Sequence, residues 1–171
     1  MTIRTTLAAA ALAAAAALPA TGPAAAQDAL VDFQALAPAT ALKAAQAALD
    51  HCTEAGYQAG IHVTDRWGVP QVFLRARFAG AHVYETSMRK AWTAASFGDP
   101  TTTLEENTRA DNNTNAIRDL SMALALGGGL PIESGDGALV GAIGVSGAPT
   151  PEADDACAQA GIDAIFDDIA F

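Results

Sequence analysis

Few side chains in the sequence could bind a metal or move a proton, and the three histidines are the first candidates. His51 and His82 each lie in or beside a stretch with helical spacing, where either could supply one ligand to a metal centre or simply be solvated. His62 lies opposite Ile61 and Val63 in an alternating stretch, so we expect it to be exposed or to line a groove. The histidines and cysteines show none of the spacings typical of zinc sites, and no structural zinc is predicted.

Two arginines could instead recognise an anion. Arg75 and Arg77 lie on the same face of a predicted strand as Phe73, and two guanidinium groups on one face can hold a carboxylate through forked hydrogen bonds. The alternative is an edge strand that charge protects from pairing with other chains. Ser146 has no base placed by the sequence, and its Gly-Val-Ser-Gly-Ala context is one residue out of step with the nucleophile motif G-x-S-x-G. The sequence therefore predicts no catalytic constellation.

The glycine-rich stretch 127–148 indicates a structural role rather than a catalytic or phosphate-binding one. No Gly-Lys-Ser/Thr follows Gly127–Gly129, so the stretch is not a phosphate-binding P-loop. The Asp136-Gly137 pair lies between two apolar runs and predicts a tight hairpin turn. Residues 139–145 then have the pattern of a buried strand whose glycines admit a close neighbour.

The first 26 residues have the features of a secretory signal peptide. A single charge, Arg4, precedes a Leu/Ala run, and small residues up to Ala26 predict cleavage after that residue. The apolar run is too short to span a bilayer, and no second one follows. The sequence thus predicts a periplasmic or secreted protein with three parts: the signal peptide 1–26, a lead-in segment 27–39 and one domain, 40–171.

Charge and cysteine content limit the partners of the exported chain. Cleavage would remove Arg4 and no acidic residue, leaving eight Lys and Arg against 19 Asp and Glu. Such a chain repels nucleic acid and anionic membranes, so no nucleic-acid partner and no membrane span are expected. In an oxidising compartment Cys52 and Cys157 could form a disulfide; the alternative is two buried thiols on helices.

Apolar periodicity predicts one α+β domain, a mostly antiparallel sheet flanked by helices in α/β/α-like layers. Helices are expected at about 40–55, with Thr40 as N-cap, and at 82–97 and 151–168, with one further turn at 101–107. Strands are expected at 61–64, 72–78, 120–126 and 139–145, and the glycine hairpin brings the number to about five. The polar run 109–115 is expected to be a mobile loop.

Several segments carry a resemblance to a known family. The ordered motifs are GGLPI at 128–132, VGAIGVSGA at 140–148 and DACAQAGI at 155–162, with KAWTA at 90–94 upstream. Together they resemble the GlcG/HbpS-like haem-binding family, which includes the C-terminal domain of PduO-type corrinoid adenosyltransferases. The resemblance extends over about residues 41–165.

The resemblance implies a symmetric homo-oligomer that binds haem. On this basis His51 is the tentative ligand of the haem iron, and the expected ligand-binding residues are Arg75, Arg77, His82 and Thr93. Two alternatives stay open. The protein could be an accessory binding protein for a small organic hydroxy acid in a periplasmic oxidation pathway, with the arginines on its carboxylate, or an enzyme that degrades haem.

Overall fold

A computed structural model describes residues 30–170 of the 171-residue chain. The predicted signal peptide and its cleavage site lie outside the described residues. The compact domain begins at Gln34, and the description below concerns this domain.

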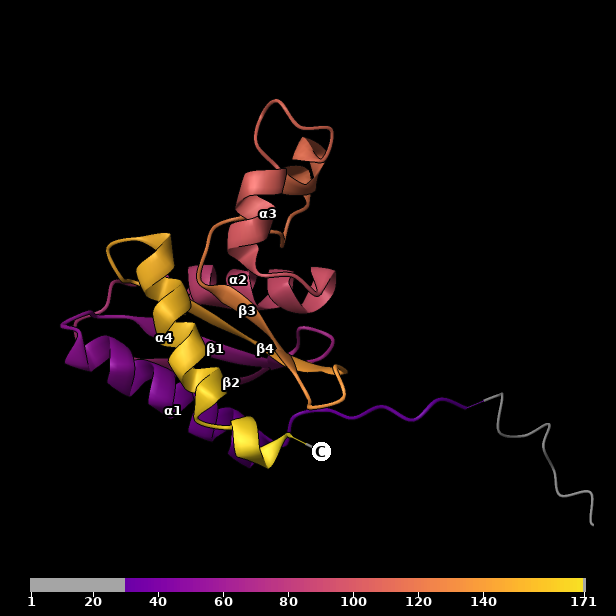
Figure 1. Ribbon diagram of the computed structural model, residues 1–171. Helices are drawn as coiled ribbons and strands as arrows, with labels where there is room; N and C mark the ends of the chain where they lie inside the picture. The colour runs from indigo at the N-terminus through magenta and orange to yellow at the C-terminus, as the bar shows by residue number, and fades with distance from the viewer. Residues whose placement is uncertain (1–29, 171) are drawn as a thin grey trace, which may run out of the picture. The chain divides into compact units, whose positions relative to one another are not determined.

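The centre of the domain is one four-stranded sheet in which every neighbouring pair is antiparallel. Its strands follow the order β2-β1-β4-β3, so β1 and β4 are central and β2 and β3 are the edges (Figure 1). The strands are β1 (Gly60–Asp65), β2 (Pro70–Arg75), β3 (Gly129–Glu133) and β4 (Leu139–Ser146).

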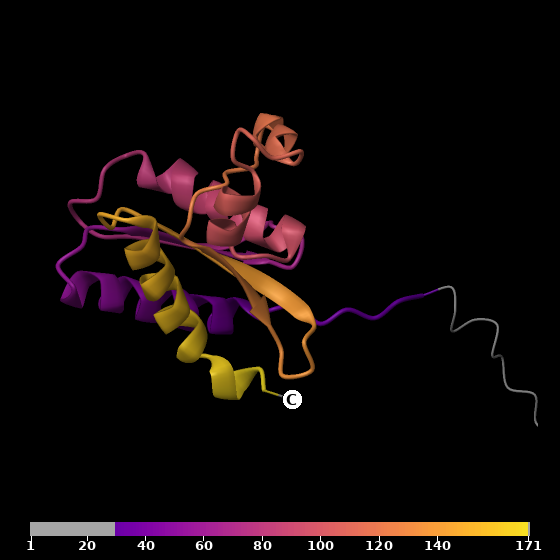
Figure 2. The same ribbon diagram turned by 45° about the horizontal axis from the view of Figure 1, so that its top comes forward.

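Helices cover both faces of this sheet. The pair α1 (Pro38–Glu54) and α4 (Pro151–Asp163) packs on one face, and α2 (Val83–Phe97) packs on the other (Figure 2). The short elements are α3 (Thr101–Asn107), η2 (Asn115–Asp119) and η3 (Phe166–Asp168). The predicted α+β domain with α/β/α-like layers is therefore confirmed.

The alternation along β1 explains how the layers pack. Ile61 and Val63 point to the α1/α4 face and join the main apolar core. His62 and Thr64 point to the opposite face, where α2 covers them, and both are buried. The prediction that His62 is exposed or lines a groove is wrong, because a central strand between two helical layers has no solvated face.

Small residues let α1 and α4 approach each other closely. The buried side of α1 consists of Ala41, Ala44, Ala45, Ala48 and Cys52. A Cβ added at Gly161 of α4 would lie 2.7 Å from the carbonyl oxygen of Ala44. At this contact Cys52 and Cys157 form a disulfide with a Cα–Cα distance of 5.5 Å. Of the two alternatives for the cysteines, the bridge is the one that forms.

The predicted fifth strand is wrong. Residues 120–126 form turns and coil, because side chains of α2 bind their backbone. Arg89 donates to the carbonyl oxygens of Met122 and Ala123, and the Leu124 N–H donates to the hydroxyl of Thr93. These groups take the place of partners in a strand ladder.

Two predicted boundaries also change. Helix α1 begins at Pro38 with Ala37 as its N-cap, rather than at Thr40. Proline suits the first turn because its missing N–H would have no helical partner there. Strand β2 ends at Arg75, so Arg77 lies beyond it in a turn and does not continue the strand face.

The predicted hairpin is confirmed by β3 and β4, whose connecting turn places Gly137 at a φ of +81°. The polar run after α3 is held by hydrogen bonds. Asn112, Asn115 and Arg118 donate to the backbone carbonyl groups of residues 105–108 at the end of α3. A side-chain cap of this kind satisfies carbonyl groups that the helix leaves without partners.

Candidate functional site

The end of the sheet where β2 stops and α2 starts carries exposed aromatic and cationic side chains. Gly60, which pairs with Arg75, has no Cβ; one added there would lie 2.6 Å from Cγ2 of Val83. This close approach lets the chain cross from β2 to α2 within residues 76–82. We call the surface formed by Arg75, Arg77, Phe78, His82 and Tyr84 the crossover surface.

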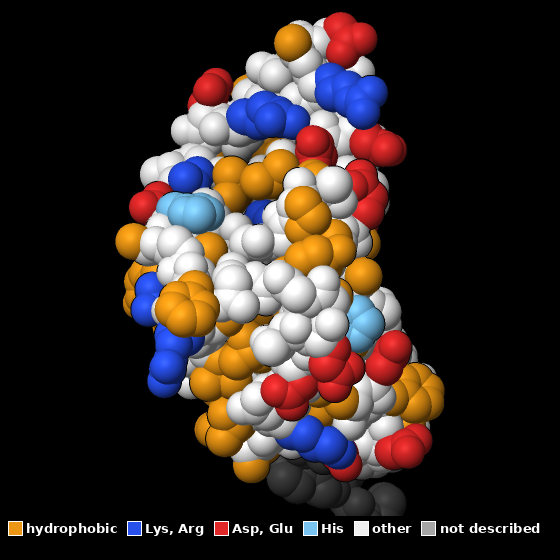
Figure 3. Space-filling model, turned by 90° about the vertical axis from the view of Figure 1, so that its left-hand side faces the viewer, with side chains coloured by type: hydrophobic (Ala, Val, Ile, Leu, Met, Phe, Trp, Pro, Cys, Tyr) orange, Lys and Arg blue, Asp and Glu red, His pale blue; other side chains and the backbone are white. Residues whose placement is uncertain are grey.

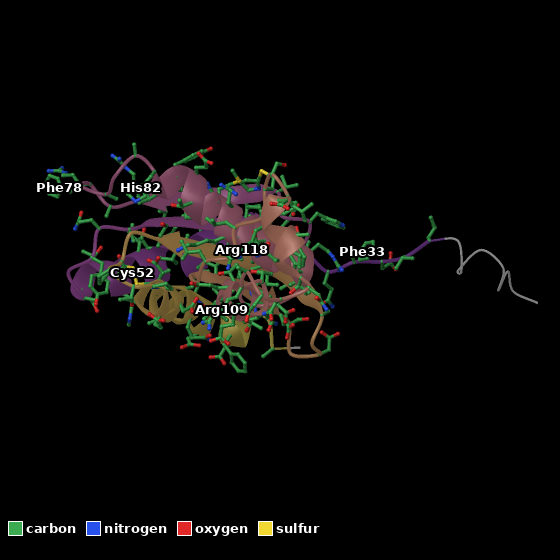
Figure 4. The ribbon with its side chains drawn as sticks, turned by 90° about the horizontal axis from the view of Figure 1, so that it is seen from above. Phe33, Cys52, Phe78, His82, Arg109 and Arg118 are labelled. Atoms are coloured by element: carbon green, nitrogen blue, oxygen red, sulfur yellow. A yellow bond between two sulfur atoms is a disulfide. The ribbon has the colours of Figure 1, made fainter. Side chains whose placement is uncertain are left out.

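Aromatic rings on the crossover surface lie open to solvent. Phe78 is 79% exposed and Tyr84 is 54% exposed. Figure 4 shows Phe78 and His82 at the same end of the domain. Exposed aromatic rings offer faces on which a planar ligand can stack.

The same surface carries positive charge on an acidic protein, whose formal net charge is −10. Arg75 donates a hydrogen bond of 3.0 Å to the carbonyl oxygen of Ala79. Arg77 forms no ion pair within residues 30–170. Figure 3 shows this end: blue, pale-blue and orange side chains lie beside one another on the left, and most of the red ones lie on the right.

His82 immediately precedes α2, and its imidazole ring lies against the backbone of Gly80. A Cβ added at Gly80 would lie 2.7 Å from both Nδ1 and Cε1 of His82. The missing side chain at Gly80 therefore makes room for the ring. The crossover surface thus combines an imidazole, two guanidinium groups and two aromatic rings, a set that suits a planar anion with an iron centre.

A second histidine lies buried behind the crossover surface, and sequence reasoning gave it no role. The ring of His62 is 1% exposed and stacks on Phe73 at 4.4 Å, while Tyr84 meets it edge-on at 5.0 Å. Its Nδ1 lies 2.8 Å from Oγ of Ser87. Burial lowers the pKa of His62 to about 4, so the ring is neutral at pH 7.

Hydrogen bonding determines the tautomer of His62. The Ser87 hydroxyl donates to the carbonyl oxygen of Val83 at 2.5 Å, so its oxygen accepts from the ring and Nδ1 carries the hydrogen. Nε2 then has a lone pair. A histidine inside a predicted strand was the signal in the sequence that could have identified this site.

The buried ion pair between Lys90 of α2 and Asp154 of α4 lies beside the end of β4. Lys90 Nζ is 2.8 Å from the Asp154 carboxylate and donates to the carbonyl oxygen of Val145. The other carboxylate oxygen accepts from the Ala148 N–H. Burial raises the pKa of Asp154, and the charge of Lys90 opposes that shift. The pair joins α2 to the start of α4 and has the geometry of a structural contact.

The remaining sequence-predicted residues lie apart from the crossover surface. His51 is exposed on α1, so the sheet separates it from His82. Thr93 is fully buried, and its hydroxyl donates to Arg89 O and accepts from the Leu124 N–H. Within residues 30–170, no group of three or more His, Cys, Asp or Glu side chains could hold a metal ion. No helix in the same range is long and apolar enough to cross a membrane.

The layered fold and the crossover surface define a small α/β/α domain with the features of a ligand-binding protein. The family described as haem degrading protein HbpS-like matches residues 36–163, and the chain belongs to this family. No curated protein sequence matches the chain.

Solved structures agree with the family assignment. A double mutant of HbpS from Streptomyces reticuli is 34% identical, with a TM-score of 0.75, covering 88% of this chain and 97% of that one. The Klebsiella pneumoniae protein ORFY is 26% identical, with a TM-score of 0.75, covering 79% of this chain and 93% of that one. PduOC in complex with haem is 26% identical, with a TM-score of 0.71, covering 77% of this chain and 95% of that one.

Proposed function

We propose that this protein binds haem at the crossover surface and that it does so outside the cytoplasm. The observation that carries the proposal is the convergence of unpaired positive charge, exposed aromatic rings and one imidazole at a single end of an otherwise acidic domain. Membership of the HbpS-like family and the haem complex of PduOC support the choice of ligand.

The residue types on the crossover surface are suited to binding haem. His82 would hold the iron through an imidazole nitrogen, and Arg75 and Arg77 would pair with the propionate groups through forked hydrogen bonds. Phe78 and Tyr84 would stack on the porphyrin. The bound iron would supply redox and small-molecule binding chemistry, and the protein would determine its exposure to solvent.

His51 and Thr93 remain candidates with different geometry. His51 would reach the same iron as His82 only from a second copy of the chain, because the sheet separates them within one copy. A symmetric homo-oligomer, which we propose for this protein, offers such an arrangement. Thr93 would have to give up its hydrogen bond from Leu124 to meet a ligand.

The proposed location follows from the leader sequence and is supported by the disulfide. Residues 1–26 have the pattern of a signal peptide. Structural disulfides persist mainly in oxidising compartments, and Cys52–Cys157 is buried between two helices. We therefore propose a periplasmic or secreted protein.

A haemin titration of the purified protein tests the function. We expect a saturable shift of the Soret band at micromolar haemin, a weakening of about tenfold or more in His82→Ala, and a smaller one in Arg77→Glu. His51→Ala is the matched variant on the opposite face and tests the other candidate ligand. If His51→Ala alone loses the shift, the ligand is on α1; if none of the proteins binds haemin at this concentration, haem is not the ligand.

The arginines also support a second candidate, a carrier for a small hydroxy acid, because one carboxylate would be enough to engage Arg77. A thermal-shift series of hydroxy acids distinguishes this case, since a specific ligand raises the melting temperature by mass action. Haem degradation is tested separately. A degrading enzyme would release iron from bound haemin when given a reductant, whereas a carrier would leave the haem intact.

A further inference from the structure

We propose that His62 acts as an acid-sensitive latch beneath the first turn of α2 and thereby regulates the crossover surface. The proposal rests on the proposed function, because the regulated surface is the one assigned to haem. When Nε2 takes up a proton, the ring becomes a cation, the contact between α2 and the sheet weakens, Tyr84 and His82 lose their support, and bound ligand is released.

The latch is built from an aromatic stack that joins the sheet to the surface. His62 on β1 lies between Phe73 of β2 and Tyr84 of α2, and the rings of Phe73 and Tyr84 also meet edge-on at 4.8 Å. Tyr84 is half exposed and lies two residues after His82. A change in the charge or position of the His62 ring would therefore act on Tyr84, which belongs to the crossover surface.

The second ring nitrogen of His62 has no hydrogen-bond partner in the described part of the chain. Gln71 Oε1 is the one enclosed side-chain polar atom without a partner within residues 30–170. His62 Nε2 likewise has no hydrogen-bond partner within these residues, so its lone pair is free to take up a proton.

The surroundings of His62 disfavour a positive charge. No carboxylate pairs with it in the described part of the chain. Phe73 faces the ring from β2, Tyr84 and Ser87 from α2, and Gly144 lies opposite it on β4. Charged groups on α2 are engaged elsewhere: Glu85 with Arg89, and Lys90 with Asp154. The positive end of the α2 dipole adds to the repulsion.

The test uses amide hydrogen exchange on the haem-free protein. Between pH 6.5 and pH 4, after correction for intrinsic exchange, we expect amides of residues 87–90 to exchange about tenfold faster, while those of α1 stay protected. His62→Phe keeps a ring in the stack and cannot titrate, so it should show no such change. His51→Gln is the control and should behave like the parent protein. Equal acceleration in His62→Phe and the parent would overturn the proposal.

Proton NMR of the parent protein keeps the test independent of that variant. The Cε1 proton of His62 should titrate with a pKa of about 4, and the ring signals of Tyr84 should shift with it. Titration of His62 without any change at Tyr84 would also overturn the latch.

A ligand experiment then separates the latch from the function. Parent protein loaded with haemin at pH 7 should release it about tenfold faster at pH 4.5 than His62→Phe does. Failure to bind haemin at pH 7 would refute the proposed function alone, since the exchange experiment needs no haemin. Equal release from both proteins would refute the latch alone.

Discussion

The two faces of the sheet are covered by different kinds of side chain. On the α1/α4 face the contact is made by alanines, branched aliphatic residues and one disulfide. On the α2 face the buried residues include His62, Ser87, Lys90 and Thr93. Within residues 30–170, most of the buried groups that titrate or need hydrogen-bond partners belong to the second face.

This difference separates a face whose contribution to stability is independent of pH from a face whose contribution depends on protonation. Apolar burial is insensitive to pH, and a disulfide restricts the unfolded chain whatever the state of the ligand. A buried imidazole or ion pair makes stability depend on protons and on precise geometry. The crossover surface lies at the edge of the responsive face, which fits a role in binding and release.

The largest expected effect comes from removing the amine of the buried ion pair. Lys90→Met leaves the carboxylate of Asp154 buried without its cation, and we expect a loss of about 4 kcal/mol in the free energy of unfolding. Urea unfolding at pH 7 measures it. The double variant Lys90→Met/Asp154→Leu should recover a large part of the loss, because no unpaired charge then remains. A loss below about 1 kcal/mol in the single variant would show that the pair is solvated.

The disulfide tests the opposite face. Cys52 and Cys157 are 105 residues apart in sequence, so the bridge restricts most of the unfolded domain. Replacing both with alanine should cost about 3 kcal/mol, measured by urea unfolding without reductant. Haemin affinity at pH 7 should change little, since the bridge lies across the sheet from the crossover surface. A large loss of affinity would mean that the two faces are coupled.

The sequence predicted the layers well because each rests on local periodicity. Ile61 and Val63 revealed β1, and Asp136-Gly137 revealed the hairpin. Features that depend on contacts between residues distant in sequence could not be predicted. The run at 120–126 is as apolar as a strand, but its backbone binds Arg89 and Thr93 from another element. The burial of His62 depends on a second helical layer, and the disulfide depends on a Cα distance that no spacing specifies.

The pH dependence of stability should be a property of the α2 face. The pKa of His62 is about 4 in the fold and near 6.5 when unfolded, so between these values the unfolded chain binds more protons. This contribution is therefore complete above pH 6.5 and is lost as the pH falls towards 4, by about 2 kcal/mol. Urea unfolding at pH 7 and pH 4.5 gives the difference. His62→Phe should lack this part of the pH dependence, and His51→Gln should retain it.

The smallest expected effect is that of Thr93→Val, which distinguishes a structural role of the Thr93 hydroxyl from a role in ligand binding. Thr93→Val keeps the shape of the side chain but removes the oxygen that accepts from the Leu124 N–H, so we expect a loss of about 1 kcal/mol. Haemin affinity should be unchanged if the hydroxyl serves only to hold residues 120–126 against α2. Both quantities can be measured on one preparation, by urea unfolding and by Soret titration. Loss of haemin binding with little loss of stability would instead make Thr93 a ligand, and would move the binding site from the end of the α2 face into its interior.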